Sequence, residues 1–312
     1  MNIWLTVLLF VLGIAFVVKG GDFFVDAAGF IAEISGIPKY IIGATIVSLA
    51  TTLPEMIVSV IAAAEGKVEM AVGNAVGSVT ANTGLILAIA MVFMTIIIRR
   101  KDYIRQILML VCAAAALWLS SLSGRLRLWG DILLFAIFIY FVYDNLKNAK
   151  TTSAEREKRE HSKKELAVNL LKFVLGAAGI VIGSNLLVDS GSQIAGYLGV
   201  PERIIAVTMV AVGTSLPELV TTITAIIKKQ TSLSVGNIIG ANIIDITLIL
   251  PLCSIVSGTE LPIAMQSVSL DMPACLIIIS AAVLPLLIRQ KASKLQGILL
   301  LLMYAAYIAL VL

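Results

Sequence analysis

Ten apolar runs, separated by more polar segments, make up about 70% of this sequence of 312 residues. A helix of about 20 apolar residues crosses a bilayer, and runs that are apolar throughout, without alternating at period two, indicate helices and exclude a β-barrel. The runs extend over Ile3–Lys19, Lys39–Ala63, Glu69–Ile98, Ile104–Leu122, Trp129–Tyr143, Ala167–Val188, Arg203–Ile227, Ser232–Val256, Ser267–Ile288 and Leu295–Leu312. The sequence therefore predicts an all-α integral membrane protein with ten transmembrane helices.

Composition excludes the other classes of protein. Charged residues are only 13% of the chain, against about a quarter in soluble domains. The three cysteines lie within apolar runs, which is typical of buried residues and argues against a disulfide scaffold. The one histidine, His161, lies in a polar loop, so no histidine is expected inside the membrane. No basic segment and cleavage site precede the first run, which we interpret as a retained span.

The distribution of Lys and Arg predicts the orientation of the chain. With the amino terminus outside, only Lys67, Arg125, Arg127 and Arg203 of the 23 basic residues face the outside. The others gather at cytoplasmic edges and in the central loop, 144–166, which we interpret as a solvated linker. We expect a multi-pass protein of the plasma (inner) membrane with both termini outside and the central loop in the cytoplasm. The net charge of +4 reflects this topology and predicts no nucleic-acid partner.

The two halves of the chain resemble each other at a constant offset of 163 positions. Segment 36–55, which ends in Leu53-Pro54-Glu55, matches segment 199–218, which ends in Leu216-Pro217-Glu218, and Gly73-Asn74 matches Gly236-Asn237. The matches fall on Gly, Pro, Asn, Thr and Glu, so chance similarity between apolar helices does not explain them. We predict repeats at 1–143 and 167–312, with the matching segments at 36–84 and 199–247. Five spans per repeat give the second repeat the opposite orientation, as in many secondary transporters.

Glu55 and Glu218 lie deep in their predicted spans. A charge at the bilayer centre costs at least about 3 kcal/mol, and no Lys or Arg lies in the middle of any span to neutralise them. Either the two acids are protonated and hydrogen-bonded, or bound metal cations compensate them. Their neighbours favour cations, because hydroxyls lie three, four and seven positions before Glu55, on the same helix face. These hydroxyls belong to Thr52, Thr51 and Ser48, and the equivalent positions hold Ser215, Thr214 and Ala211.

Proline residues add backbone oxygens to this pattern. Pro54 and Pro217 each remove a helical hydrogen bond and free the carbonyl four residues earlier. A lone proline would indicate a kink, but beside a glutamate in both repeats it favours an all-oxygen site for hard cations.

The next span of each repeat supplies a second set of polar and small residues. Asn74, Ser78 and Asn82 share one helix face, as do Asn237 and Asp245. We expect the two asparagines Asn74 and Asn237 to brace the broken helices, and Gly73, Gly77, Gly236 and Gly240 to allow close helix packing. Asp22, Asp26, Asn185 and Asp189 lie near predicted span ends, which favours helix capping or a place at the membrane interface.

The paired motifs, G-A-T-x-V-…-T-T-L-P-E and V-A-V-G-T-S-L-P-E, each followed by G-N-x-x-G, resemble the α-repeats of the calcium/cation antiporter superfamily, in particular its prokaryotic Na⁺/Ca²⁺ exchanger branch. The resemblance covers nearly the whole chain. It implies that Glu55 and Glu218 bind Ca²⁺ with the backbone oxygens of Thr51 and Thr214. It implies that Na⁺ contacts the same acids, the side chains of Thr52, Ser78 and Ser215, and the carbonyls of Ser48 and Ala211, with Asn82 and Asp245 at the border of the central position.

Two departures affect the predicted ion coupling. Ala241 stands where the family commonly has Ser, which affects one Na⁺ site and the stoichiometry. The Glu-His pair of the proton-coupled branch is missing after both Gly-Asn motifs, which favours sodium coupling. The resemblance also implies that the first and sixth spans slide across the other helices to alternate access.

These observations predict a secondary active antiporter that exchanges Na⁺ for Ca²⁺, with these ions and the lipid bilayer as its partners and with no cofactor. An H⁺/Ca²⁺ or other cation antiporter is the nearest alternative. An intramembrane enzyme has little support, because no embedded histidine and no nucleophile beside a base is found. A passive channel also remains open, as does the oligomeric state.

Overall fold

The computed structural model describes residues 3–154, 163–199, 213–258 and 260–311, and nearly all of them are helical. In the first repeat, α1 covers Ile3–Ser35, and one continuous helix follows as α2 (Lys39–Ile42), the π-helical segment η1 (Gly43–Val47) and α3 (Ser48–Ala64). The next is built the same way from α4 (Val68–Ala81), η2 (Asn82–Leu87) and α5 (Ala88–Phe93). Helices α6 (Arg100–Ser121) and α7 (Leu128–Ala154) complete this half, with the short strand β1 (Arg125–Leu126) between them.

The second half repeats this order. It comprises α8 (Lys163–Tyr197), α11 (Leu216–Ile227), α12 (Thr231–Ile244) with η4 (Asp245–Ile249) and α13 (Leu250–Ser257), then β2 (Leu261–Pro262), η5 (Ser267–Asp271) with α14 (Met272–Arg289), and α15 (Lys294–Val311). Strand β2 pairs antiparallel with β1, with Leu126 opposite Leu261, and so ties the two repeats together at one end of the bundle.

Nine of the ten predicted spans are confirmed as helices long and apolar enough to cross a membrane, counted over the described residues. The tenth, predicted as Arg203–Ile227, is described only from residue 213 onward, where α11 is a shorter apolar helix.

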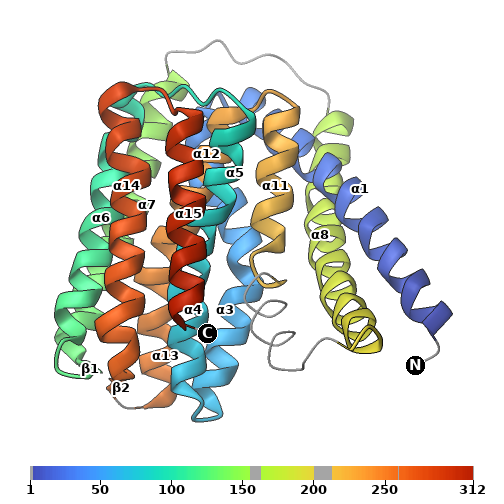
Figure 1. The fold of residues 1–312 in the computed structure, drawn as a ribbon. Coiled ribbons are helices and arrows are strands. Elements are labelled where there is room, and N and C mark those ends of the chain that lie inside the picture. Colours follow the sequence, from blue (N-terminus) through green and yellow to red (C-terminus); the bar gives the residue numbers. More distant parts are fainter. Residues whose placement is uncertain (1–2, 155–162, 200–212, 259, 312) are drawn as a thin grey trace.

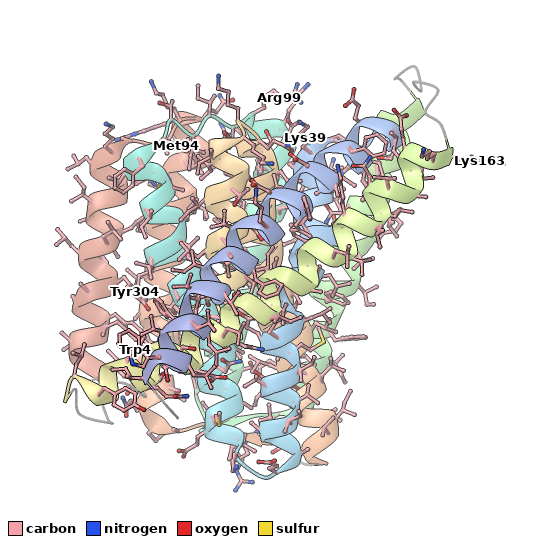
Figure 2. The ribbon with its side chains drawn as sticks, turned by 90° about the vertical axis from the view of Figure 1, so that its right-hand side faces the viewer. Trp4, Lys39, Met94, Arg99, Lys163 and Tyr304 are labelled. Atoms are coloured by element: carbon pink, nitrogen blue, oxygen red, sulfur yellow. The ribbon has the colours of Figure 1, made fainter. Side chains whose placement is uncertain are left out.

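The predicted bounds of the first, fifth and sixth spans were wrong. The fifth, expected as Trp129–Tyr143, is α7 and continues to Ala154, so the first part of the predicted linker, 144–166, is helical. For the other two we expected Ile3–Lys19 and Ala167–Val188, but α1 and α8 extend to Ser35 and Tyr197. At 1.5 Å per residue, these helices of 33 and 35 residues are about 50 Å long, more than a bilayer core is thick. They are accommodated by tilting: Figure 2 shows α1 and α8 crossing the bundle obliquely, with Trp4 and Lys163 near opposite ends.

Helices α1 and α8 pack on each other along most of their length, at one side of the bundle (Figure 1). Glycines set this contact: a Cβ added at Gly20 would lie 2.8–3.0 Å from the backbone of α8 at Gly176, Gly179 and Ile180. Backbones that approach this closely are typical of membrane helices with small residues at their interface. The pair therefore forms one closely packed unit beside the other helices.

Helix α12 lies at the centre of the remaining helices, and every residue from Leu233 to Ile244 is buried. Its glycines permit contact with the first repeat, since a Cβ at Gly236 or Gly240 would collide with the backbone of Tyr40 or Ala44. Because α12 and α4 are enclosed by protein, their amide and hydroxyl groups face other helices, and lipid does not surround them.

Candidate ion-binding site

Glu55 and Glu218 occupy equivalent positions, and each is only 1% exposed. Glu55 lies within α3, which continues as a helix through Pro54. Glu218 lies in the first turn of α11. Pro217 is well placed in this turn, because proline has no backbone N–H and the N–H groups of a first turn have no partner within the helix. Residues Thr214 and Ser215 form a turn before α11, so the expected helix break is present in the second repeat, while Pro54 leaves α3 unbroken.

Hydroxyl groups connect the two glutamates across the repeats. Thr52 Oγ1 donates to Glu218 Oε1 at 3.4 Å, although Thr52 and Glu218 belong to opposite repeats. Thr51 Oγ1 lies 3.3 Å from both the Ser48 carbonyl and the Asn237 side-chain oxygen. Thr52 lies three residues before Glu55 on α3, so its hydrogen bond brings Glu218 against the helix that carries Glu55. The repeats therefore meet at a shared group of oxygen atoms.

Asn74 bridges both repeats at this position. Its Nδ2 donates to the Glu55 carbonyl at 3.3 Å and to Ser59 Oγ at 2.9 Å, and its Oδ1 accepts from Thr214 Oγ1 at 3.4 Å. These contacts place Asn74 between α3 and the turn that precedes α11, and the expected bracing role stays a prediction.

Many buried oxygen atoms of this group have no hydrogen-bond partner among the described residues. They include both carboxylate oxygens of Glu55 and Asp245, one of Glu218, and the side-chain oxygens of Ser78, Asn82 and Ser215. A buried polar atom without a partner costs about 1–3 kcal/mol, and a charged one costs more. Hard cations such as Na⁺ and Ca²⁺ are bound by carboxylate, hydroxyl and carbonyl oxygens, so the donor set fits such cations.

Asp245 lies in η4 and is 1% exposed. Within the described residues, no group of three or more Asp, Glu, His or Cys side chains is arranged to hold one metal ion. Asp245 therefore does not complete a three-carboxylate cluster with Glu55 and Glu218, and its place at the border of the central position stays a prediction. Ala241, equivalent to Ser78, is fully buried in α12, and Ala211 lies outside the described residues.

The four expected packing glycines differ in what the structure shows. Gly236 and Gly240 lie directly against the first repeat, as described above. No atom of the described residues lies within 4 Å of a Cβ added at Gly73 or Gly77. The offset of 163 places residues 203 and 207 opposite them, and these lie outside the described residues, so for Gly73 and Gly77 the packing role stays a prediction.

For Asp22 and Asp26 we expected helix capping or a place at the membrane interface; capping was wrong, and the interfacial place stays a prediction. Both lie inside α1, and their carboxylates form ion pairs with Lys228, which lies just beyond the end of α11. The distances from Lys228 Nζ are 3.3 Å to Asp22 Oδ1 and 2.8 Å to Asp26 Oδ1. Partial burial lowers the pKa of Lys228, but the hydrogen bonds and charges of Asp26 and Asp22 outweigh it, so its pKa lies above the usual value. The apolar runs carried no signal for this contact, because it depends on how α11 sits against α1.

Sequence reasoning also missed Ser59, which accepts from Asn74 and is fully buried. Its equivalent, Thr222, is likewise fully buried, and its hydroxyl has no partner among the described residues. A hydroxyl four positions after the glutamate in both repeats was the signal that could have identified them.

Comparison with known proteins gives consistent results. The family described as "Sodium/calcium exchanger protein" matches residues 5–146 and 168–312. The chain is 29% identical to the sodium/calcium exchanger MaX1 of Methanosarcina acetivorans, covering 96% of this chain and 97% of that protein. It is 33% identical to the inner membrane protein YrbG of Escherichia coli, over 81% and 80%. A solved structure of the sodium-calcium exchanger NCX_Mj superimposes with a TM-score of 0.85 at 28% identity, covering 98% of this chain and 99% of that one.

Proposed function

The chain belongs to the sodium/calcium exchanger family of multi-pass membrane transporters, and from this membership we propose that it exchanges Na⁺ for Ca²⁺ across the plasma membrane by alternating access. The relative from Methanosarcina acetivorans and the solved NCX_Mj structure both carry the name of sodium/calcium exchangers, which supports these two ions as the substrates.

The observation that carries this proposal is the group of unpartnered buried oxygens around Glu55 and Glu218. No protein cation lies beside these carboxylates in the described residues, since the ion pairs there involve other acids. Leaving such charges buried and unpaired is costly, so a bound metal cation is the natural counter-charge. Carboxylates supplied by opposite repeats would then hold the ion where the repeats meet, near the midplane.

In the proposed cycle, Ca²⁺ is held by Glu55 and Glu218 with the backbone oxygens of Thr51 and Thr214. Sodium ions share the same acids and add the hydroxyls of Thr52, Ser78 and Ser215 and the carbonyls of Ser48 and Ala211. Asn82 and Asp245 border the central position. Because both loadings need the same two carboxylates, Ca²⁺ and Na⁺ displace each other, which is the requirement for exchange.

Alternating access is proposed to come from the α1–α8 pair. These two helices pack tightly on each other and lie at one side of the remaining helices (Figure 1). A unit of this kind can slide as a body while the helices that carry Glu55 and Glu218 keep their positions.

Proton coupling is the second candidate, and Ala241 is the observation that favours it. The missing hydroxyl at this buried position removes one Na⁺ ligand that Ser78 supplies in the other repeat. Exchange of Ca²⁺ for H⁺ would then use the same carboxylates as proton carriers.

Uptake of ⁴⁵Ca²⁺ into Na⁺-loaded proteoliposomes tests both candidates. We expect uptake that requires an outward Na⁺ gradient and is lost in Glu55→Gln. Glu69→Gln removes an exposed acid outside the site and is expected to leave uptake unchanged. Uptake driven by a pH gradient without Na⁺ would establish proton coupling, and flux that needs no counter-ion would indicate a channel.

A further inference from the structure

A cavity of about 270 Å³ lies between α8, α3 and the turn that begins α11. Helix α8 contributes Ser184, Asn185 and Asp189, while Pro54 and Pro217 form part of the opposite side. With about 30 Å³ per molecule in liquid water, the cavity has room for a cation together with several of its water ligands.

The side of the cavity formed by α8 carries the polar groups. Ser184 is only 2% exposed, and its Oγ has no hydrogen-bond partner among the described residues. Asp189 is the only ionisable residue among the described lining residues, so the local field favours a cation. Asp189 was expected to cap a helix or to lie at the membrane interface; α8 continues to Tyr197, so the carboxylate does not cap this helix.

The cavity adjoins the proposed ion site. Pro54 and Pro217, which line it, immediately precede Glu55 and Glu218 in the sequence. Thr214, which also lines it, donates to Asn74, and Asn74 contacts the backbone of Glu55. A cation in this cavity would therefore be separated from the two glutamates by a single layer of residues.

The equivalent positions of the first repeat hold two acids, and these acids bind a cationic group. At the offset of 163, Asn185 corresponds to Asp22 and Asp189 to Asp26. On α1, these two carboxylates hold the ammonium group of Lys228 at 3.3 and 2.8 Å. The position equivalent to Lys228 is Glu65, an acid. No lysine therefore stands at the equivalent position to bind Asn185 and Asp189.

We propose that Asp189, with Asn185 and Ser184, forms a transit site that takes a hydrated metal cation from solution before it passes to Glu218. This inference rests on the proposed exchange function. A single carboxylate with neutral oxygens binds weakly and releases readily, and it attracts a divalent cation more strongly than a monovalent one. The site therefore raises the rate at which Ca²⁺ enters, without taking part in the final coordination.

Transport kinetics test this role. In Asp189→Asn, we expect the Ca²⁺ concentration for half-maximal exchange to rise on the order of threefold to tenfold, with an unchanged maximal rate. The effect should be confined to the membrane side that the cavity faces and should shrink at high ionic strength. Asp189→Glu should restore the wild-type value, and Glu69→Gln, which removes an exposed acid elsewhere, should not change it.

A second measurement is independent of transport. Asn185→Cys, in a variant whose three native cysteines are replaced, reports the local potential through its reaction rates with cationic and anionic methanethiosulfonate reagents. We expect the cationic reagent to react faster, and the preference to fall several-fold when Asp189→Asn is added. Millimolar Ca²⁺ should slow the cationic reagent only while Asp189 is present.

The outcomes separate the two proposals. Without Na⁺-coupled uptake in the wild type, the exchange function itself fails, and the reagent rates still report whether the cavity attracts cations. If the wild type exchanges and Asp189→Asn keeps its Ca²⁺ dependence and reagent preference, the transit site is wrong. A fall in maximal rate with unchanged half-saturation would also contradict it, because this would indicate a structural role for Asp189.

Discussion

At the scale of single residues, the buried acid Asp245 of the second repeat corresponds to the neutral Asn82 of the first. Both side chains are 1% exposed and keep oxygen atoms without partners among the described residues. These two positions are thus equally buried in the two repeats but differ in charge. The added carboxylate lies in the second repeat, in η4.

Replacing Asp245 by Asn should stabilise the ion-free protein. The amide keeps the shape of the side chain but removes a buried group without a counter-charge, which is worth on the order of 1–2 kcal/mol. We expect a higher melting temperature without ions and a smaller rise when Na⁺ or Ca²⁺ is added, measured by thermal unfolding in detergent. A lower melting temperature in the ion-free state would show that Asp245 has an internal partner.

Ala241→Ser tests the sodium ligands. The new hydroxyl would stand where the first repeat has Ser78, so it should lower the Na⁺ concentration that gives half-maximal Ca²⁺ exchange. Ser78→Ala is the matched change and should raise that concentration. Equal Na⁺ dependence in both variants and the wild type would exclude these two positions from the Na⁺ sites.

At the scale of elements, the sequence predicted the helices well because continuous apolar runs have few other solutions in a bilayer. It failed at the ends of α1 and α8, where Asp22, just after the predicted end at Lys19, and Asp189 interrupted the apolar pattern but not the helix. A tilted helix can carry such residues when a neighbour or an aqueous cavity receives them. Those partners come from distant parts of the chain, so no local pattern reveals them.

In the candidate site too, the sequence singled out residues but did not reveal the contacts between the repeats. Glu55 and Glu218 stood out because a repeat of costly residues is a strong signal in an apolar sequence, and Asn74 stood out by its place in the repeat. Their ion-binding and bracing roles stay predictions. The hydrogen bond from Thr52 to Glu218 and the ion pairs of Lys228 depend on how the two repeats are docked, which spacing alone does not specify.

Gly20→Ala should separate α1 from α8. The added methyl group would lie 2.8–3.0 Å from the backbone of α8, and overpacking of this kind typically costs about 1–3 kcal/mol. We expect a lower melting temperature and slower exchange, with Ca²⁺ binding to the detergent-solubilised protein little changed. Val18→Ala, at an exposed position on the same helix, serves as the control. Unchanged exchange in Gly20→Ala would argue against a single packed unit.

At the scale of the whole molecule, the structure gives the two faces of the transporter. Both chain termini lie at one end of the bundle, and Lys163 lies at the other (Figures 1 and 2). Under the proposed orientation, the end with the termini faces the outside and the end with most basic residues faces the cytoplasm.

Single cysteines in a cysteine-free variant test this orientation. An impermeant maleimide added to intact cells should label Lys67→Cys, between α3 and α4, because that connection faces the outside. It should label Lys163→Cys only after the cells are permeabilised. The reverse pattern would place the termini in the cytoplasm.

The unpartnered carboxylates also bear on how tightly the two fluxes are linked. An empty carrier that closed around Glu55, Glu218 and Asp245 would have to enclose their charge with no counter-ion, a state whose cost rises steeply as water is excluded. Under the proposed alternating-access mechanism, reorientation without a bound ion would therefore be slow for an electrostatic reason, and uncoupled flux would be small. The proposed exchange would then couple the two ions because the empty occluded state has a high free energy.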